Sequence, residues 1–254
     1  MSSKLVRLGL LVSLVLGTLF ALPCSAFRND FEHTYPLKPG GSFELQNVNG
    51  RVEVQGWDRP EVEIRATKTA TKSHSDLERV HIDVNANPDS VSVVTQYPQD
   101  EGVDVVVDYT IRLPHTAQVE HITTVNGTLV VSGVDTLRDL RTVNGNIEVY
   151  EAGGTLHAKT TNGNLHLELA RFEGANDATA DTTNGSVLLA ILPGAGARIE
   201  ARSLNGDFRT ELPLALESSL APREIHGTLG GGGGSIRLHT VNGSIRVVAL
   251  RSSV

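Results

Sequence analysis

The sequence predicts an all-β protein, folded as a solenoid of stacked strand–turn–strand repeats with an N-terminal antiparallel β layer. Two observations lead to this fold class. The dipeptide Asn-Gly occurs seven times, and from its second copy onward it recurs with a period of about 20 residues. Apolar and polar residues alternate strictly on both sides of these dipeptides, which is the period of half-buried strands, and no comparable stretch shows a helical period.

The repeat unit places a turn between two strands. A Thr, Ser or Asn stands two residues before each Asn, and an apolar residue stands two residues after each Gly. Tight turns need positive φ, which Gly adopts freely and Asn tolerates, so we expect each dipeptide to form a structural turn. A degenerate copy, His226-Gly227, divides the longest gap. The seven turns are Asn49-Gly50, Asn126-Gly127, Asn144-Gly145, Asn162-Gly163, Asn184-Gly185, Asn205-Gly206 and Asn242-Gly243.

Two architectures fit this unit. Each Asn-Gly either closes a hairpin of a β-meander sandwich or forms the corner of a solenoid coil. Identical residue types at a fixed period are explained by stacking in register, which separate hairpins do not need. The solenoid is therefore favoured, and the β-meander sandwich remains the alternative. The recurring Thr is expected to point inward, where its hydroxyl can satisfy backbone groups at the bend.

The residue before each Asn is expected to face outward, because side chains alternate along a strand. This column is mostly apolar. It is a candidate binding stripe or a seam with another subunit, although β-branched residues also simply suit strand ends. The candidate stripe comprises Val48, Val125, Val143, Leu204 and Val241, and Thr161 and Thr183 fill the same column in the remaining copies.

The chain divides into residues 1–26, a signal peptide, residues 27–118, an N-terminal β region with the first repeat, and residues 119–254, the β-repeat region. We expect residues 27–254 to form one continuous structural unit. Between Gly56 and Thr116 several alternating segments predict antiparallel strands with longer loops, and residues 76–79 suit one helical turn. A run of five glycines, residues 230–234, predicts a flexible loop before the last pair of strands.

The N-terminus predicts export. Lys4 and Arg7 precede an apolar run of about 15 residues, and Cys24-Ser25-Ala26 supplies the small residues of a cleavage site near Ala26. The apolar run is shorter than the ~20 residues of a spanning helix. Cleavage before Cys24, as in a lipoprotein, is disfavoured by Pro23. The protein is therefore expected in the periplasm, on the cell surface or secreted.

The net charge, the cysteine content and the apolar runs limit the classes of partner and site that the protein can have. The formal net charge is −7, which disfavours nucleic acid and anionic membranes. The one cysteine lies in the signal peptide, so the mature chain has neither disulfides nor thiolate metal sites. No second apolar run is long enough for a transmembrane segment.

No catalytic motif is evident, and no cofactor or catalytic residue is expected. His157 and His166 are expected on the outer faces of adjacent strands, where opposed imidazoles can hold a metal, but a solvated strand face is the favoured explanation. Trp57 is expected to pack where the first repeat meets the inserted strands. No metal site is predicted.

The residues around the first repeat resemble a known family. Residues 48–54, VNGRVEV, lead into Gly56-Trp57-Asp58, and a strand ending Ile111-Arg112-Leu113-Pro114 precedes the serial Thr-x-Asn-Gly units. This pattern resembles the widespread bacterial family called "putative adhesin", exported β-repeat proteins with a domain of unknown function. The resemblance implies the fold and an adhesin-like role, and it carries no functional residues to transfer.

The sequence features are consistent with three functional hypotheses. The favoured hypothesis is a non-enzymatic, adhesin-like binding module that recognises a protein or glycan of the cell envelope or surface. A self-associating periplasmic scaffold is the second. A polysaccharide-acting enzyme is the third, because solenoids can host such enzymes, but the repeat columns contain no clustered carboxylates.

Overall fold

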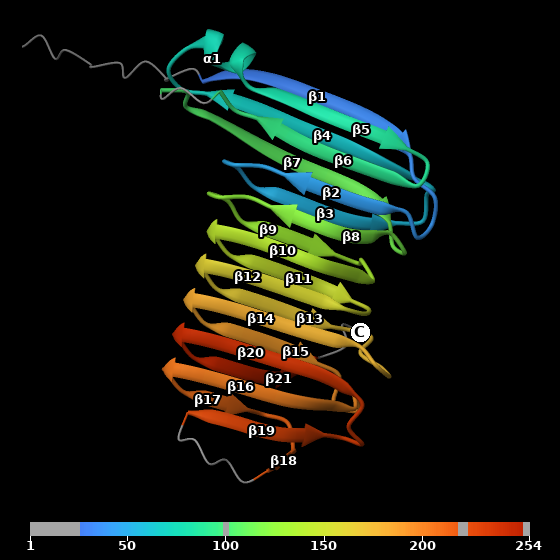
Figure 1. Ribbon diagram of the computed structural model, residues 1–254, viewed down its shortest axis with the longest axis vertical. Helices are drawn as coiled ribbons and strands as arrows, with labels where there is room; N and C mark the ends of the chain where they lie inside the picture. The colour runs from blue at the N-terminus through green and yellow to red at the C-terminus, as the bar shows by residue number, and fades with distance from the viewer. Residues whose placement is uncertain (1–25, 99–101, 218–222, 251–254) are drawn as a thin grey trace, which may run out of the picture.

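The computed structural model describes residues 26–98, 102–217 and 223–250, and the predicted signal peptide lies outside them apart from Ala26. Two long sheets face each other (Figure 1). Sheet A has ten strands in the order β1-β4-β7-β3-β9-β11-β13-β15-β21-β17. Sheet B has eleven strands in the order β18-β19-β16-β20-β14-β12-β10-β8-β2-β6-β5.

Each repeat is one coil, with a strand in sheet B, an Asn-Gly corner and a strand in sheet A. Strands of neighbouring coils pair in parallel, which confirms the solenoid and rules out a meander of hairpins. The coils are β2 (Ser42–Gln46) with β3 (Val52–Trp57), β8 (Gln118–Thr123) with β9 (Leu129–Ser132), β10 (Thr136–Asn144) with β11 (Ile147–Ala152), β12 (Leu156–Asn162) with β13 (Leu165–Leu169), β14 (Asp177–Asn184) with β15 (Val187–Ile191), β16 (Ala197–Asn205) with β17 (Phe208–Thr210), and β20 (Gly234–Asn242) with β21 (Ile245–Ala249).

The core lies between the two sheets and runs through the stack. In β12, Leu156, Ala158 and Thr160 point inward and are buried, and in β13 the residues Leu165 and Leu167 do the same. Because every coil repeats this alternation in register, the buried apolar side chains form one continuous column. Burial of apolar area on this scale is the main stabilising term for such a fold.

The coils do not stack in chain order. The last coil, β20 with β21, lies between β14 with β15 and β16 with β17 (Figure 1). The segment 192–196, which connects β15 to β16, therefore passes the last coil and lies beside the glycine-rich residues 230–234. The Gly234 amide donates to the Gly196 carbonyl at 3.2 Å. Residues 230–233 form a defined turn there, in which Gly230, Gly232 and Gly233 have positive φ.

His226-Gly227 is not a degenerate corner, so that prediction is wrong. Both residues lie inside β19 (Glu224–Leu229), which pairs antiparallel with β16. β18 (Leu214–Leu216) then pairs antiparallel with β19 and ends sheet B. Antiparallel strands can pair with a solenoid edge without presenting a further corner, so they end the parallel stack.

The inserted N-terminal strands extend both sheets rather than forming a separate layer. β7 (Val105–Pro114) pairs parallel with β3 and is followed outward by the antiparallel strands β4 (Glu61–Ala70) and β1 (Phe27–Pro36). In sheet B, β6 (Ser90–Gln96) pairs parallel with β2, and β5 (His81–Asn87) pairs antiparallel with β6. The expected antiparallel strands are therefore present, continuous with the solenoid.

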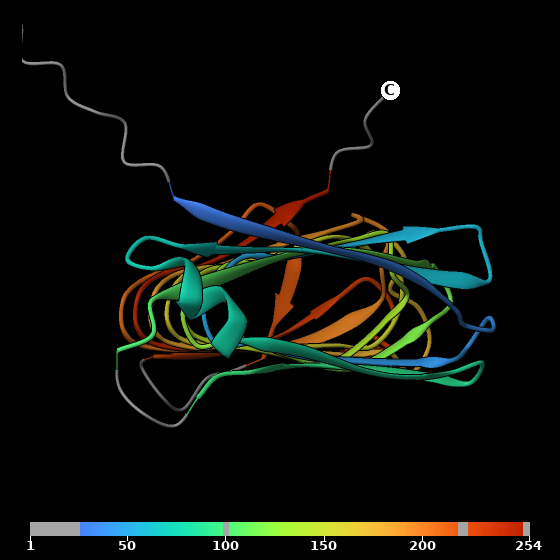
Figure 2. The same ribbon diagram turned by 90° about the horizontal axis from the view of Figure 1, so that it is seen from above.

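A single-turn helix, α1 (His74–Arg79), lies at one side of the N-terminal end, between the two sheets (Figure 2). The Ser73 hydroxyl caps it by accepting a hydrogen bond from the Ser75 amide at 3.2 Å. The Lys68 ammonium donates to the carbonyls of Leu77 and Val80 at its other end, at 2.8 and 2.9 Å. Leu77 is buried, so the helix closes part of the core.

Candidate functional site: the Asn-Gly edge

The seven Asn-Gly corners stack along one side of the solenoid, which we call the Asn-Gly edge. After Asn49, the first in the stack, the side-chain amide of each corner Asn donates to the Oδ1 of the Asn in the preceding coil of the stack. The distance is 2.7 Å between Asn126 and Asn49 and 2.8 Å at every other step. In stacking order the ladder runs through Asn49, Asn126, Asn144, Asn162, Asn184, Asn242 and Asn205.

The corner glycines are required for a reason other than the predicted one. Of the seven, only Gly50 has positive φ. At the other six, a Cβ would overlap the carbonyl oxygen of the corner glycine in the adjacent coil, as at Gly163 against Gly145. Close stacking of backbone on backbone, rather than turn conformation, therefore excludes a side chain at Gly127, Gly145, Gly163, Gly185, Gly206 and Gly243.

The same glycine carbonyls explain the inward Thr column. The Thr160 hydroxyl donates to the Gly145 carbonyl at 3.0 Å, and equivalent bonds of 2.8–2.9 Å recur at Thr142, Thr182, Thr240 and Ser203. These side chains are buried, as expected from their parity. A carbonyl that points toward the core needs a partner, and the buried hydroxyl supplies it.

The candidate binding stripe is exposed in the structure. Val125, Val143 and Leu204 are 39%, 41% and 43% exposed, and Val48 and Val241 are half-buried. Stacking in register brings the column together, as shown by the Val125 amide donating to the Val48 carbonyl at 2.9 Å. In stacking order it reads Val48, Val125, Val143, Thr161, Thr183, Val241 and Leu204. The insertion of the last coil places Val241 beside Thr183, where chain order alone would place Leu204.

This arrangement carries no acid, base or nucleophile. An apolar ridge runs beside a row of side-chain amides, and both follow the ~4.8 Å spacing of the coils. Its chemistry is that of recognition, with apolar contact from the stripe and hydrogen bonding from any amide group that the ladder leaves free.

Sequence reasoning missed a polar cleft on the opposite side of the solenoid. It has a volume of about 770 Å³, and its lining includes Asp135, Glu151, Glu168 and Arg171. Arg171 forms an ion pair with Asp135, and Glu151 has a φ of 57°. These residues lie in or beside loops of different coils, outside the repeat columns, so no periodic signal in the sequence brings them together.

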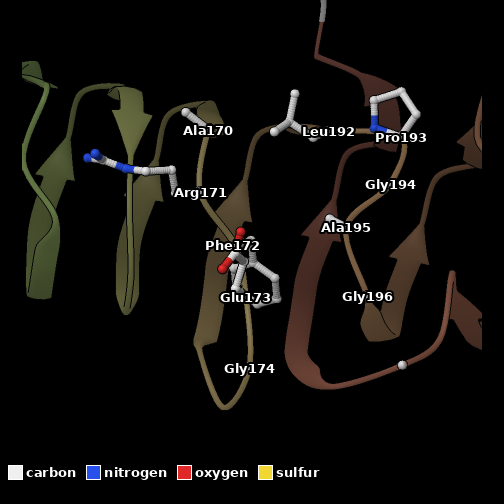
Figure 3. A pocket seen from close by; sticks show the side chains of 11 residues that line it. Ala170, Arg171, Phe172, Glu173, Gly174, Leu192, Pro193, Gly194, Ala195 and Gly196 are labelled. Carbon is white, nitrogen blue, oxygen red and sulfur yellow. The ribbon is translucent and has the colours of Figure 1, made fainter.

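A second depression of about 500 Å³ adjoins this cleft, where the loop after β13 faces the loop after β15. Figure 3 shows Arg171 extending away from Leu192 and Pro193, which lie on the other side of the depression. Phe172 is buried, and the other lining residues are mostly small. The depression therefore offers little chemistry of its own.

The opposed histidines do not meet. His157 lies in β12 of sheet B and His166 in β13 of sheet A, so their outer faces point away from each other. His157 pairs with Asp177 at 2.9 Å, and His166 with Glu168 at 3.3 Å. In the part of the chain that the structure describes, no group of three or more His, Cys, Asp or Glu residues is placed to hold a metal ion.

Trp57 lies where β3 meets β7, opposite Pro114, as expected. Its indole N–H donates to the Glu61 carbonyl at 2.9 Å, and the Arg59 guanidinium lies 5.1 Å from the ring centre. Trp57 also lines a shallow surface depression with Pro39 and Pro60. The side chain therefore joins the first coil to the inserted strands.

The fold and the repeated corners match a known family. The family described as Toastrack DUF4097 matches residues 34–248. The chain belongs to this family. The likeness to adhesin-like β-repeat proteins with a domain of unknown function, drawn from the residues around Val48 and Trp57, is thereby confirmed, and no curated protein matches the chain.

Among solved structures, proteins from two bacteria are similar to the chain. A "putative cell adhesion protein" from Clostridium sporogenes has a TM-score of 0.51 at 8% identity, covering 87% of this chain and 100% of that one. A "putative adhesin" from Bacteroides fragilis has a TM-score of 0.41 at 11% identity, covering 87% of this chain and 97% of that one. The first likeness shows a shared fold. Among the described residues, no helix has the length and apolar character needed to cross a membrane.

Proposed function

We propose that the protein is a non-enzymatic, adhesin-like binding module of the cell envelope or surface, and that the Asn-Gly edge is its binding surface. The observation that carries the proposal is the exposed apolar stripe. Three of its residues are among the few large apolar side chains exposed in the described chain, and they share one column. Contiguous exposed apolar surface is typical of interaction sites.

The geometry of the edge supports recognition of an extended partner. Seven side chains at ~4.8 Å steps form a ridge about 29 Å long. The continuous ladder of amide hydrogen bonds and the buried Thr bonds fix the ridge, so little side-chain or backbone entropy is lost on binding. A protein segment or a glycan chain of the envelope, lying along the coils, fits this length and mixture of apolar and amide groups.

A double substitution in the stripe tests the proposal. Val125→Lys with Val143→Lys places two cations at the second and third of the seven positions of the ridge, and we expect at least a tenfold loss of sedimentation with an isolated cell-envelope fraction. Val106→Lys is the matched control, because Val106 is 38% exposed on a strand outside the stripe. Equal binding by the double variant and the parent protein would exclude the Asn-Gly edge as the binding surface.

Export and location are tested separately. Protease treatment of intact cells, beside a periplasmic control protein, should digest a surface protein and spare a periplasmic one. Digestion on intact cells supports adhesion. Protection until the outer membrane is opened contradicts surface adhesion and leaves a periplasmic binding module.

The alternative function is a self-associating periplasmic scaffold, with the stripe as a seam between copies. Light scattering distinguishes the two functions. If the stripe joins copies of the chain, the parent protein associates and the Val125→Lys and Val143→Lys double variant is monomeric. A polysaccharide-acting enzyme is the third possibility, for which the carboxylates of the polar cleft are the candidate groups. Release of reducing sugar from envelope polysaccharide would favour it.

A further inference from the structure

The four edges of the two sheets differ in length. β17 and β18 have three residues each and β5 has seven, whereas β1 has ten. β1 pairs with β4 at ten consecutive positions without a bulge, and no strand of the described residues pairs with its other side. Proteins usually shorten, bend or charge such an edge, because its free backbone groups can pair with another strand. The longest edge of this protein is neither short nor bent.

One face of β1 is aromatic. Phe27, Phe31 and Tyr35 lie opposite Ala70, Ala66 and Val62 of β4, which are buried, so these three aromatic side chains are on the inner face of sheet A. Yet Phe27 is 39% exposed, and Phe31 and Tyr35 are only half-buried. His33 lies between them, with ring centres 4.6 Å from Phe31 and 6.1 Å from Tyr35.

The exposure has a topological cause. Beyond the first coil, sheet A continues for three strands, β7, β4 and β1, whereas sheet B continues for two, β6 and β5. β1 therefore extends past the opposing sheet, and Figure 2 shows it as the outermost strand of its layer at this end. Three of the ten phenylalanines and tyrosines of the protein stand on this strand. The elements α1 and β5 cover it only in part, and the Phe27 ring packs edge-on against His74 of α1 with ring centres 5.8 Å apart.

The charges on the other face of β1 are already paired within the molecule. The Arg28 guanidinium lies 2.9 Å from the Asp30 carboxylate, and the Arg65 guanidinium lies 3.1 Å from Glu32. Hydrogen bonds from Arg28 and Thr67 lower the pKa of Asp30. Unpaired charges of one sign would repel a second strand, and here each carboxylate has its own cation.

We propose that β1 pairs antiparallel with β1 of a second copy of this chain, about a two-fold axis at Phe31. In this register Phe31 faces the partner's Phe31, and Phe27 faces the partner's Tyr35, so all three aromatic positions meet aromatic rings. Residues 27–35 pair over nine positions, and the two ten-stranded sheets become one. Aromatic pairs opposite one another stabilise antiparallel strands.

Neighbouring registers are poorer. An axis at Asp30 or Glu32 pairs Phe31 with the partner's Asn29 or the partner's His33, so none of the three Phe and Tyr positions faces another of them. The axis at Phe31 places Asp30 opposite the partner's Glu32, beside Arg28 and the partner's Arg65, so added salt should tighten the dimer by screening that repulsion. One strand per protomer is a small interface, so the dimer forms in a concentration-dependent manner.

This inference is independent of the proposed binding surface, because β1 lies at the end of the stack and not on the Asn-Gly edge (Figure 1). Light scattering of the exported protein over a wide concentration range should show a rise from monomer to dimer mass. Phe31→Lys should shift the midpoint at least tenfold to higher concentration. Phe208→Lys, in the short edge strand β17, is the matched control and should leave the midpoint unchanged. A parent protein that stays monomeric throughout overturns the proposal.

Cysteine cross-linking tests the register, with no other cysteine in the mature chain to compete. Phe31→Cys should form a disulfide-linked dimer under mild oxidation, because the two positions face each other across the axis. Asp30→Cys should not, because the two positions are then offset by two residues along the strands. Cross-linking at Asp30→Cys instead, or at neither position, overturns the pairing about Phe31. Thermal unfolding of each variant as monomer verifies that it is folded.

Discussion

At Gly163, the backbone carbonyl of Gly145 lies where a side chain would begin. Gly163→Ala must therefore separate two coils or distort the corner, and we expect it to lower the free energy of unfolding by about 3 kcal/mol, at the upper end of overpacking costs. Gly194→Ala is the control, since a Cβ there has no atom within 4 Å and the residue does not have positive φ. Urea unfolding of both variants measures the difference. Equal, small losses would contradict the close-stacking account.

The contribution of the Thr160 hydroxyl to stability can be measured apart from the contribution of the side chain's volume. Thr160→Val keeps the side-chain volume and removes the donor to the half-buried Gly145 carbonyl, from a side chain that is itself buried. We expect a loss of about 1–3 kcal/mol in the free energy of unfolding. Thr161→Val changes the exposed neighbouring residue in the same way and should have little effect. A hydroxyl that contributes only strand propensity would give the two variants the same stability.

At the scale of the strand, alternation and the Asn-Gly period predict the coil strands, the inward Thr and the outward stripe. They do not predict why Gly163 is glycine, because that depends on the distance between coils and not on the local sequence. They also misassign His226-Gly227, since a strand that pairs antiparallel with β16 carries the same alternation as one that turns a corner. The polar cleft around Glu151 and Arg171 is assembled from strand ends and the loops that follow them, and the loops carry no period.

Two strands near the N-terminal end are joined across the core by a hydrogen bond to Tyr109, and the burial of this tyrosine makes stability depend on pH. The Tyr109 hydroxyl in β7 lies 2.7 Å from the Thr95 hydroxyl in β6, and Tyr109 is 2% exposed. Burial raises the pKa of Tyr109, and it raises the pKa of Tyr97 to about 12. An unfolded tyrosine ionises near pH 10, so above this pH the unfolded state loses protons first and stability falls.

Replacing Tyr109 therefore gives a defined pH profile. Tyr109→Phe should unfold at lower urea than the parent at pH 8, because the buried Thr95 hydroxyl loses its partner. Between pH 9 and 11.5 its stability should fall less steeply than that of the parent, because the variant has no Tyr109 hydroxyl to ionise on unfolding. Tyr97 remains, so some alkaline loss persists. Parallel pH profiles for variant and parent would show that Tyr109 does not ionise on unfolding.

At the scale of the whole molecule, the repeat predicts a solenoid but not the order of its coils. Each coil presents nearly the same corner and the same alternating strands, so β14 can accept either β16 or β20 in the same register. The sequence contains no local signal that distinguishes these neighbours. The two strands differ in their pairing at the end of the stack. Only β16 also pairs with the antiparallel strand β19, which with β18 ends sheet B.

Because β16 and β20 can each pair with β14, the order in which the coils assemble during folding can be tested. β16 is synthesised before β20 and can stack directly on β14, and the last coil must then be inserted between them. We expect refolding from urea to show a slow phase from this non-native pairing, which a chain ending at Gly230 lacks because it has no coil to insert. No proline lies beyond residue 230, so proline isomerisation contributes equally to both chains. Identical slow phases in the two chains, measured by stopped-flow fluorescence of Trp57 and by circular dichroism, would show that β14 and β16 do not pair during folding.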